Sequence, residues 1–213
     1  PAAAWEAAYR RFESQAEELR KFGRRLRHFG VEEWPRDLKI VELFCGRGNG
    51  LRAWRSLGFV DLTGIDHSAR LLKDVEPEFR AILADVRDLP LPDGSVDVIS
   101  IHGGLHHLPK LPEDVARVLT QCHRVLRTGG RLLVVEPWQT PFLRFVHLCC
   151  RSRLLRCSWP RLDALAEMIE LEAETYFAWL GRAEAVIEAL AEVFPPDRMK
   201  IAWGKLHYLA RRR

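Results

Sequence analysis

A glycine-rich turn follows the first predicted strand and carries the clearest chemical signal in the chain. Gly46, Gly48 and Gly50 alternate along it, and Glu42 lies four residues before the first of them. Alternating glycines let the backbone approach a ligand closely, and the amides that open the next helix favour a negative group. A dinucleotide-binding turn has the spacing G-x-G-x-x-G, whereas this turn reads G-x-G-x-G. The acid at position 42 would attract a ligand ammonium rather than a phosphate.

Three histidines, His102, His106 and His107, follow the fourth predicted strand at residues 95–101. Ligands bind beside the carboxyl ends of strands in parallel sheets. A histidine with its ordinary pKa of about 6.5 can take a proton from a hydroxyl group. His102 and His106 are therefore candidate catalytic residues. The alternative for His106 and His107 is a structural role in the turn at 105–108, and His102 could instead contact the substrate.

The cysteines predict neither a metal site nor a disulfide framework. They number five, and no Cys-x-x-Cys pair occurs among them. His147, Cys149, Cys150 and Cys157 lie close in sequence, but on a helix positions 147, 150 and 157 would not converge on one point. Small buried thiols are the better interpretation, so we expect no metal. Reduced thiols, with no signal-peptide core and no apolar run of membrane-spanning length, indicate a cytoplasmic location.

The elements that must position these residues follow from the hydrophobic pattern. Short apolar runs separated by helical patterns indicate a parallel sheet with helices on both faces. Residues 1–29 predict a helix before the first strand, and residues 140–192 predict helices after the fifth strand. The predicted strands are residues 38–44, 61–66, 79–84, 95–101 and 131–136, with a terminal hairpin at 199–203 and 206–210.

Length and composition favour one folded domain. The chain has 213 residues, of which 47% are hydrophobic and 29% charged, which excludes a disordered chain or a bare coiled coil. A net charge of +4 does not by itself indicate a nucleic-acid-binding protein. We divide the domain into an N-terminal helical cap at 1–36, a central core at 37–137, a helical insertion at 138–195 and a terminal hairpin at 196–213.

In this order the motifs resemble those of the class I S-adenosylmethionine-dependent methyltransferases, and within them the small-molecule group called type 11. The resemblance covers about residues 38–136, and the hairpin fits the family's last two strands. It implies a doubly wound, Rossmann-like α/β sheet of seven strands, five parallel strands and then a terminal hairpin with an antiparallel last strand. The matching segments are residues 42–50, Asp66, residues 84–86, residues 96–108 and residues 126–132.

The resemblance also implies the cofactor S-adenosylmethionine, with S-adenosylhomocysteine as product. In the family the first motif holds the methionine part, the acid after strand two accepts the ribose hydroxyls, and the turn after strand three binds adenine. The family usually has a small or polar residue at the place of His102, so the floor of this active site is expected to differ. The implied cofactor-binding residues are Glu42, Gly46, Gly48, Gly50, Asp66, His67, Asp85, Val86 and His102.

The implied reaction is an in-line displacement of methyl from a sulfonium carbon, in which positioning and desolvation of the nucleophile supply most of the rate. The expected acceptor is a small molecule, a saccharide or a lipid-linked molecule. One alternative is a nucleic-acid (RNA) methyltransferase, but the loop after strand four lacks that class's catalytic motifs. The other is a non-catalytic Rossmann-like nucleotide-binding protein, which the presence of Glu42, Asp66 and Asp85 disfavours.

Residues 142–156 combine apolar side chains with arginines, and a helix would place Arg144, His147 and Arg151 along one stripe. This segment could form a lid for an anionic or lipid-linked acceptor and make a weak contact with a membrane surface. In the alternative interpretation its arginines pair with the acidic helices at 163–192.

Two helical segments, 1–29 and 140–180, can both reach the sheet edge where the cofactor would lie. We expect one or both to close over it and exclude water, unless the first is a fixed outer helix. The protein is expected to be a monomer or a homodimer, without a nucleic-acid partner. Candidate substrate-contacting residues are Phe12, Trp138, Arg144 and Tyr176.

Overall fold

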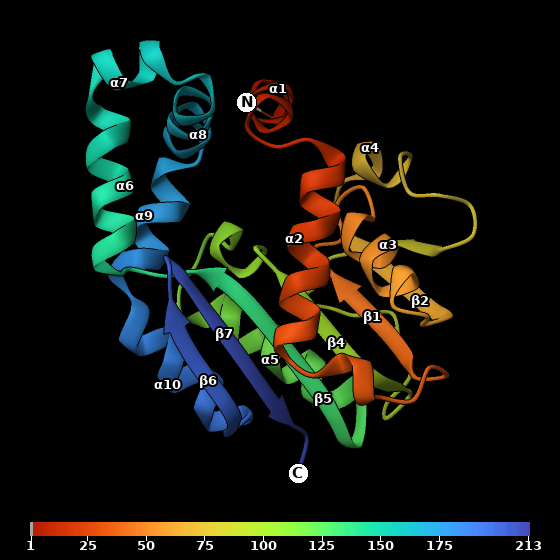
Figure 1. The fold of residues 1–213 in the computed structure, drawn as a ribbon. Coiled ribbons are helices and arrows are strands. Elements are labelled where there is room, and N and C mark those ends of the chain that lie inside the picture. The colour runs from red at the N-terminus through yellow and green to blue at the C-terminus, as the bar shows by residue number, and fades with distance from the viewer. Residues whose placement is uncertain (1) are drawn as a thin grey trace.

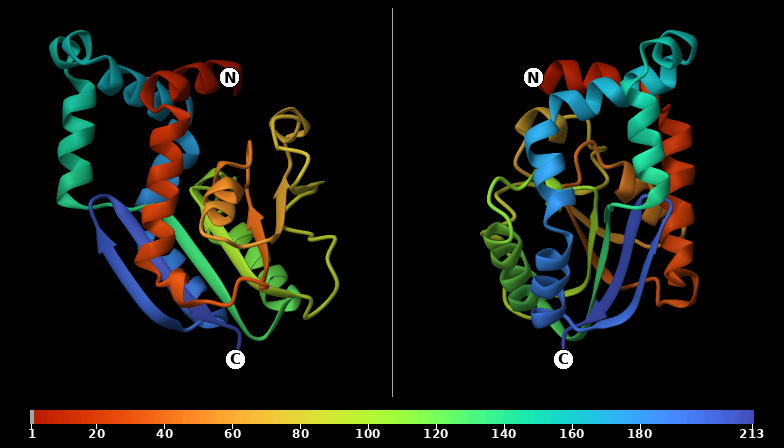
Figure 2. Two further views of the ribbon diagram at one scale, coloured as in Figure 1. Left: turned by 45° about the vertical axis from the view of Figure 1, so that its right-hand side comes forward. Right: turned by 90° about the vertical axis from the view of Figure 1, so that its left-hand side faces the viewer.

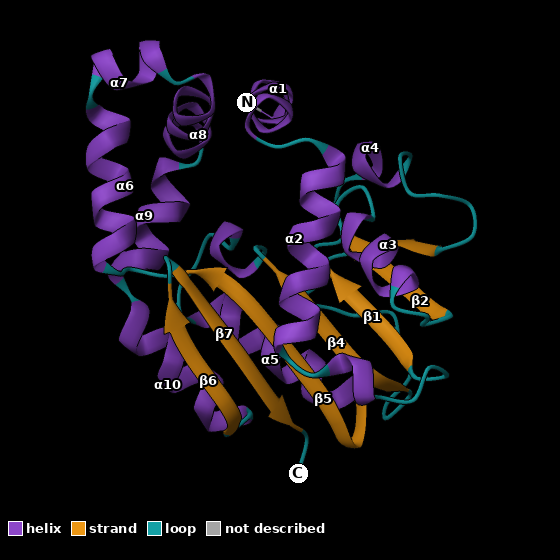
Figure 3. Ribbon diagram, viewed as in Figure 1, coloured by secondary structure: helices purple, strands orange, loops and turns teal. Residues whose placement is uncertain are grey.

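The computed structural model describes residues 2–213, and its centre is one seven-stranded sheet (Figures 1 and 3). The strand order is β3-β2-β1-β4-β5-β7-β6. Strands β1 to β5 pair in parallel, and β7 runs antiparallel to both β5 and β6. The predicted seven-stranded Rossmann-like fold is confirmed. The strands are β1 (Lys39–Leu43), β2 (Asp61–Asp66), β3 (Arg80–Leu83), β4 (Val96–His102), β5 (Leu126–Pro137), β6 (Pro196–Ala202) and β7 (Lys205–Arg211).

Helices cover both faces of the sheet, because the central strands are apolar on both sides. On one face α2 (Gln15–His28) and α3 (Asn49–Ser56) pack through Leu26 and Trp54 against Ile40 of β1. On the other face α5 (Glu113–Val125) and α10 (Ala183–Val193) pack against the side chains that alternate with these, such as Ile99. The strand order reverses between β1 and β4, and in sheets of this kind ligands bind beside the carboxyl ends of the strands at such a reversal.

The N-terminal segment was predicted as one helix over 1–29, and the structure divides it into α1 (Ala2–Phe12) and α2. The break occurs at Ser14, whose side chain accepts from the amide of Glu17 while the Glu17 carboxylate accepts from the amide of Ser14. This capping box starts a new helix and turns the chain. The turn carries α1 away from α2 and across the top of the molecule, where it lies beside α8 (Figure 2).

The segment after β5 is helical as predicted. Its helices are α6 (Pro141–Arg151), α7 (Arg153–Ser158), α8 (Pro160–Leu171), α9 (Ala173–Gly181) and α10. Helices α6, α7 and α8 project above the carboxyl edge of the sheet, while α9 and α10 return beside it (Figure 2). No helix within residues 2–213 has the length and apolar character needed to cross a membrane. Shorter elements are η1 (Val31–Glu33), α4 (Ala69–Leu72) and η2 (Leu105–His107).

Candidate active site

The glycine turn between β1 and α3 is closed by the carboxylate of Asp66 at the end of β2. The amide of Gly46 donates to Asp66 Oδ2 at 2.9 Å, and the amide of Ser68 donates to Asp66 Oδ1 at 2.8 Å. Gly46 and Gly48 have φ values of +52° and +78°, which only glycine adopts without strain. Asp66 is buried, and each of its oxygens keeps a lone pair for a further donor. This carboxylate can accept two hydroxyl groups.

Glu42 in β1 is a buried carboxylate that lacks a partner for Oε2 within residues 2–213. Burial raises its pKa well above the usual range, and the charge of Glu18 raises it further. Gly50 leaves room for this side chain, since a Cβ at position 50 would lie 2.0 Å from Glu42 Oε1. An uncompensated carboxyl group in this position fits a ligand cation.

A second acid, Glu18 of α2, lies beside this site, and the sequence pattern did not single it out. The Tyr9 hydroxyl donates to Glu18 Oε1 at 2.6 Å, and the Asn49 side-chain amide donates to Oε2 at 2.5 Å. Glu18 lies in the first turn of α2, where the helix dipole ordinarily stabilises an acid, so its residue type alone indicates no further role. Only the packing of α2 onto the sheet brings Glu18 toward Glu42.

The residues expected at the adenine and ribose positions lie along the adjoining strands. Asp85 follows β3, is partly exposed, and accepts from Arg87 Nη2 at 2.7 Å. Hydrogen bonds from Arg87 lower the pKa of Asp85 to about 2, so the carboxylate stays ionised. Val86 is buried beside it. His67 has an 80% exposed side chain, and its Nδ1 lies 3.6 Å from Asp66 Oδ1.

His102 ends β4 on the face that α2 covers. Its ring packs edge-on against Phe22, with centroids 5.1 Å apart, and neither ring nitrogen has a partner in the described chain. Burial, followed by the charge of Arg25, lowers its pKa well below the usual value, so the ring is neutral. Ser100 lies two positions earlier on the same face, in register with Glu42, and its hydroxyl is also buried without a partner.

His106 lies in η2 and is held by Glu136, an acid at the end of β5. His106 Nδ1 is 2.8 Å from Glu136 Oε2, and the amides of Gly104 and Leu105 donate to Oε1, each at 2.8 Å. Glu136 is fully buried. Because a carboxylate only accepts hydrogen bonds, Nδ1 is the donor in this contact, and Nε2 is the ring nitrogen left available to another group. The acid at the end of the fifth predicted strand was the available sequence signal for Glu136.

Comparison with known proteins shows which proteins this chain resembles. Residues 41–134 match the family model described as a methyltransferase domain. A structure from Methanococcus maripaludis, titled a putative S-adenosyl-L-methionine-dependent methyltransferase, superposes with a TM-score of 0.64 at 15% identity, covering 97% of this chain and 92% of that one. Residues 41–134 of this chain are thus similar to a methyltransferase domain, and the fold is that of solved S-adenosylmethionine-dependent methyltransferases.

Two curated relatives are similar over the same core. Demethylmenaquinone methyltransferase of Thermotoga maritima is 32% identical over 102 residues, which cover 46% of this chain and 43% of that protein. The ubiquinone/menaquinone biosynthesis C-methyltransferase UbiE of Campylobacter jejuni is 31% identical over 110 residues, which cover 47% of this chain and 45% of that protein. The chain therefore spans less than half the length of these relatives.

The cofactor of this methyltransferase family fits the residues present. Asp66 can accept the two ribose hydroxyls, and the unpartnered carboxyl of Glu42 can face the ammonium of the methionine part. Glu42 of β1 lies beside Gly50 and in register with Ser100 of β4, and His102 ends β4 on the same face. His67 and Asp85 instead follow β2 and β3.

The described residues contain one group of side chains that could hold a metal ion, and it does not include the cysteines considered in the sequence analysis. Ligand atoms of His106, His107 and Glu172 lie within 4.8 Å of one another. Burial and the neighbouring charge of His106 lower the pKa of His107 to about 3. His107 Nδ1 lies 3.4 Å from Glu172 Oε1, and Glu172 precedes α9. His147, which the sequence grouped with the cysteines, instead lies 3.1 Å from the Tyr176 hydroxyl.

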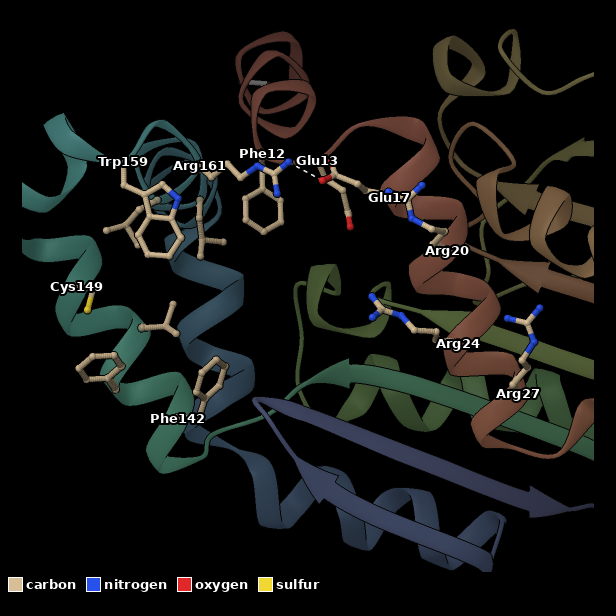
Figure 4. Close-up of a pocket in the computed structure, with 14 residues that line it drawn as sticks. Phe12, Glu13, Glu17, Arg20, Arg24, Arg27, Phe142, Cys149, Trp159 and Arg161 are labelled. Carbon is tan, nitrogen blue, oxygen red and sulfur yellow. Dashed lines mark hydrogen bonds and ion pairs between the residues drawn. The ribbon is translucent and has the colours of Figure 1, made fainter.

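The four candidate substrate residues lie in different surroundings. Phe12 lines a cavity of about 790 Å³ between α2 and the helices α6 and α8 (Figure 4). Tyr176 packs against His106, with ring centroids 6.1 Å apart. Trp138 is buried and packs edge-on against Trp179. Arg144 is exposed on α6 and is not among the residues that line the cavity.

The arginines of residues 142–156 differ in whether they form ion pairs. Arg156 pairs with Asp163 at 2.9 Å and also with Glu170, as the packed-helix interpretation predicts. Arg144, Arg151 and Arg153 make no ion pair with any residue in the described range 2–213. The acidic helices therefore neutralise only part of the basic segment.

Proposed function

We propose that this protein transfers a methyl group from S-adenosylmethionine to a small-molecule acceptor. The observation that carries the proposal is the pair of buried carboxyl groups, Glu42 and Asp66, on either side of the glycine turn. One suits an ammonium and the other a ribose diol. The cofactor, when bound, supplies a methyl group activated by the adjoining positively charged sulfur.

We assign each part of the cofactor to the residues at the end of one strand: β1, β2 or β3. Glu42, with Glu18 beyond it, faces the methionine ammonium. Asp66 accepts the ribose hydroxyls with the lone pairs that the amides of Gly46 and Ser68 leave free. Asp85 and Val86 flank the adenine, where Asp85 remains ionised and can accept from the exocyclic amine.

His106 is the proposed general base. Its Nδ1 is engaged by Glu136, which stabilises the imidazolium that forms when Nε2 accepts a proton. Glu172 Oε2 lies 4.0 Å from Nε2, so a second acid faces the same nitrogen. His102 is the weaker candidate base, because burial lowers its pKa and so weakens its affinity for a proton. We assign to His102 the floor of the site, in contact with the acceptor.

The relatives support a small acceptor rather than a nucleic acid. Two curated relatives are named for methylation in quinone biosynthesis, and this chain shares their core but less than half their length. The helices that follow β5 cover the carboxyl edge of the sheet, where the acceptor would enter (Figure 2). The acceptor atom, whether carbon, oxygen, nitrogen or sulfur, is left open by this proposal.

Isothermal titration calorimetry with S-adenosylhomocysteine, S-adenosylmethionine and NAD tests cofactor choice. We expect binding of the first two ligands and no heat from NAD. Binding of NAD alone would refute the assignment. A methyl-transfer screen with labelled cofactor, on a cell extract divided into nucleic-acid, protein, lipid and small-molecule fractions, tests the acceptor class. Label confined to the nucleic-acid fraction would contradict the proposal that the acceptor is a small molecule.

A further inference from the structure

The cavity of about 790 Å³ that Phe12 lines has two chemically different walls (Figure 4). One wall is helix α2, and the other is formed by helices α6 and α8. It lies above the carboxyl edge of the sheet, on the side where ligands enter this fold. A volume of this size is typical of sites for a single organic molecule.

The α2 wall is basic. Arg20, Arg24 and Arg27 occupy positions i, i+4 and i+7 and so form one stripe along the helix, which Figure 4 shows along one side of the opening. Arg27 pairs with Glu32 at 3.2 Å. Arg20 and Arg24 are exposed and pair with no acid anywhere in residues 2–213.

The acids that line the same cavity are already neutralised. Glu13 pairs with Lys21, and Glu17 pairs with Arg161 of α8. Hydrogen bonds from Ser14 and Arg161 lower the pKa of Glu17 to about 2, so this ion pair persists over the physiological range. Among the residues that line the cavity, the unpaired charge is therefore that of Arg20 and Arg24.

The opposite wall is apolar and exposed. Phe142, Phe145 and Trp159 are 44%, 61% and 59% exposed, and Val146, Leu162 and Leu165 fill the space between them. Large apolar side chains gathered on one surface mark a binding site, because covering them releases about 25 cal/mol per Å². A neutral polar ligand would leave this wall uncovered, and a purely apolar one would leave the arginines unpaired.

We propose that this cavity binds an amphiphile with one acidic head group, a long-chain carboxylate or phosphate, as the methyl acceptor. The head pairs with Arg20 and Arg24, and the hydrocarbon lies along Phe142, Phe145 and Trp159. A single molecule fits better than a bilayer, because the two walls face each other across a hollow instead of lying on one convex surface. The role as acceptor rests on the proposed methyltransferase function, whereas the binding itself does not.

A series of side-chain contacts along α2 links the lining of the cavity to the end of β4. Glu13, which lines the cavity, pairs with Lys21. The Lys21 ammonium lies 5.9 Å from the Phe22 ring, and that ring packs at 5.1 Å against His102. One helix therefore presents arginines to the cavity and Phe22 to the floor of the proposed active site.

The experiment is calorimetric titration, at saturating S-adenosylhomocysteine, with monomeric dodecyl phosphate, dodecanoate, dodecanol and inorganic phosphate. We expect binding of the two anionic amphiphiles, with at least about tenfold weaker binding of dodecanol and of inorganic phosphate. The ratio of dodecyl phosphate to dodecanoate affinity separates a phosphate head from a carboxylate head. Binding only to vesicles of phosphatidylglycerol, and not to monomeric amphiphiles, would overturn the proposal in favour of a membrane surface.

Matched variants locate the binding. Arg20→Ala/Arg24→Ala should weaken dodecyl phosphate binding about 10- to 100-fold, while the equally charged control Arg80→Ala/Arg213→Ala should not change it. Phe145→Ser should weaken binding of the anionic amphiphiles, while Leu148→Ser, 64% exposed on the same helix, should not. Equal effects of test and control variants would refute the site. If the wild-type chain does not bind S-adenosylhomocysteine, that result would instead count against the proposed function.

Discussion

The carboxyl group of Glu42 packs directly against the backbone of Gly50 at the start of α3, in space that any side chain at position 50 would occupy. A Cβ at position 50 would lie 2.0 Å from Glu42 Oε1 and 2.3 Å from Oε2. Gly46 and Gly48 are required for their backbone angles, whereas Gly50 is required because it leaves space for a buried carboxyl group. The alternate glycines thus serve two physical purposes.

Gly50→Ala should therefore destabilise the protein and abolish cofactor binding. Overpacking of this kind typically costs about 1–3 kcal/mol, which a urea denaturation curve would measure. The double variant Gly50→Ala/Glu42→Ala should recover stability but not S-adenosylhomocysteine binding. Gly181→Ala is the control, because a Cβ there meets no atom within 4 Å. A Gly50→Ala protein with unchanged stability and affinity would show that the Glu42 carboxyl group does not pack against position 50.

Asp66→Ala should weaken S-adenosylhomocysteine binding by about 1.5–3 kcal/mol, the range for hydrogen bonds to a charged group. Asp61→Ala, at the exposed start of the same strand, is the matched control and should leave the affinity unchanged. Calorimetry gives both values, and circular dichroism verifies that the variants are folded. If the two variants bind equally well, Asp66 does not hold the ribose.

His106→Gln should lower the rate of labelled methyl transfer about 10²–10⁴-fold, the usual contribution of a general base, with cofactor affinity unchanged. Glu136→Gln should lower the rate as well, because the carboxylate stabilises the imidazolium that forms when His106 accepts a proton. His107→Gln is the control on the same turn. A Glu136→Gln protein that retains the wild-type rate would exclude the paired-base mechanism.

Lys205 should make stability depend on pH. Burial, together with the charge of Arg25 and, more weakly, of Lys21, lowers its pKa from 10.5 to about 7, although Glu136 and Glu13 oppose the shift. Between these two pH values the unfolded chain binds more protons than the folded chain, so this group makes stability rise with pH from about 7 to 10.5.

Lys205→Met should flatten that rise, as measured by urea denaturation between pH 6.5 and 9.5. Lys200→Met, an exposed lysine of the same hairpin, should retain it. Parallel pH curves for wild type and Lys205→Met would show that Lys205 is not desolvated in the folded protein.

The helices above the sheet edge are expected to order on cofactor binding. Hydrogen exchange of residues 2–28 and 140–180 should slow when S-adenosylhomocysteine is added, and Phe12→Ala should lower cofactor affinity. Strands β1 and β4 serve as the internal control, since their amides are already paired. Equal protection in the empty and bound protein would mean that both segments are fixed.

The sequence alone predicted the first five strands, their parallel arrangement, and a glycine turn after the first strand with Asp66 at the end of the second. These features depend on local patterns: apolar runs of strand length, glycines at fixed offsets, and an acid that directly follows a strand. A local pattern specifies which residues share an element and which end of the element they occupy. That is sufficient to bring Gly46 and Asp66 together, because neighbouring parallel strands end at one edge.

Only the tertiary structure shows which side chains from different helices and strands contact one another. Glu136 meets His106 only because β5 pairs with β4, and Glu18 nears Glu42 only because α2 packs over β1. The break at Ser14 turned one predicted helix into two, and this put Phe12 opposite the apolar wall of α6 and α8. Helical periodicity gives the face on which Arg20 and Arg24 lie, but not which helix stands across from them. Which helix packs opposite α2 depends on how the whole chain packs, because no single segment buries enough surface to determine which element lies next to it.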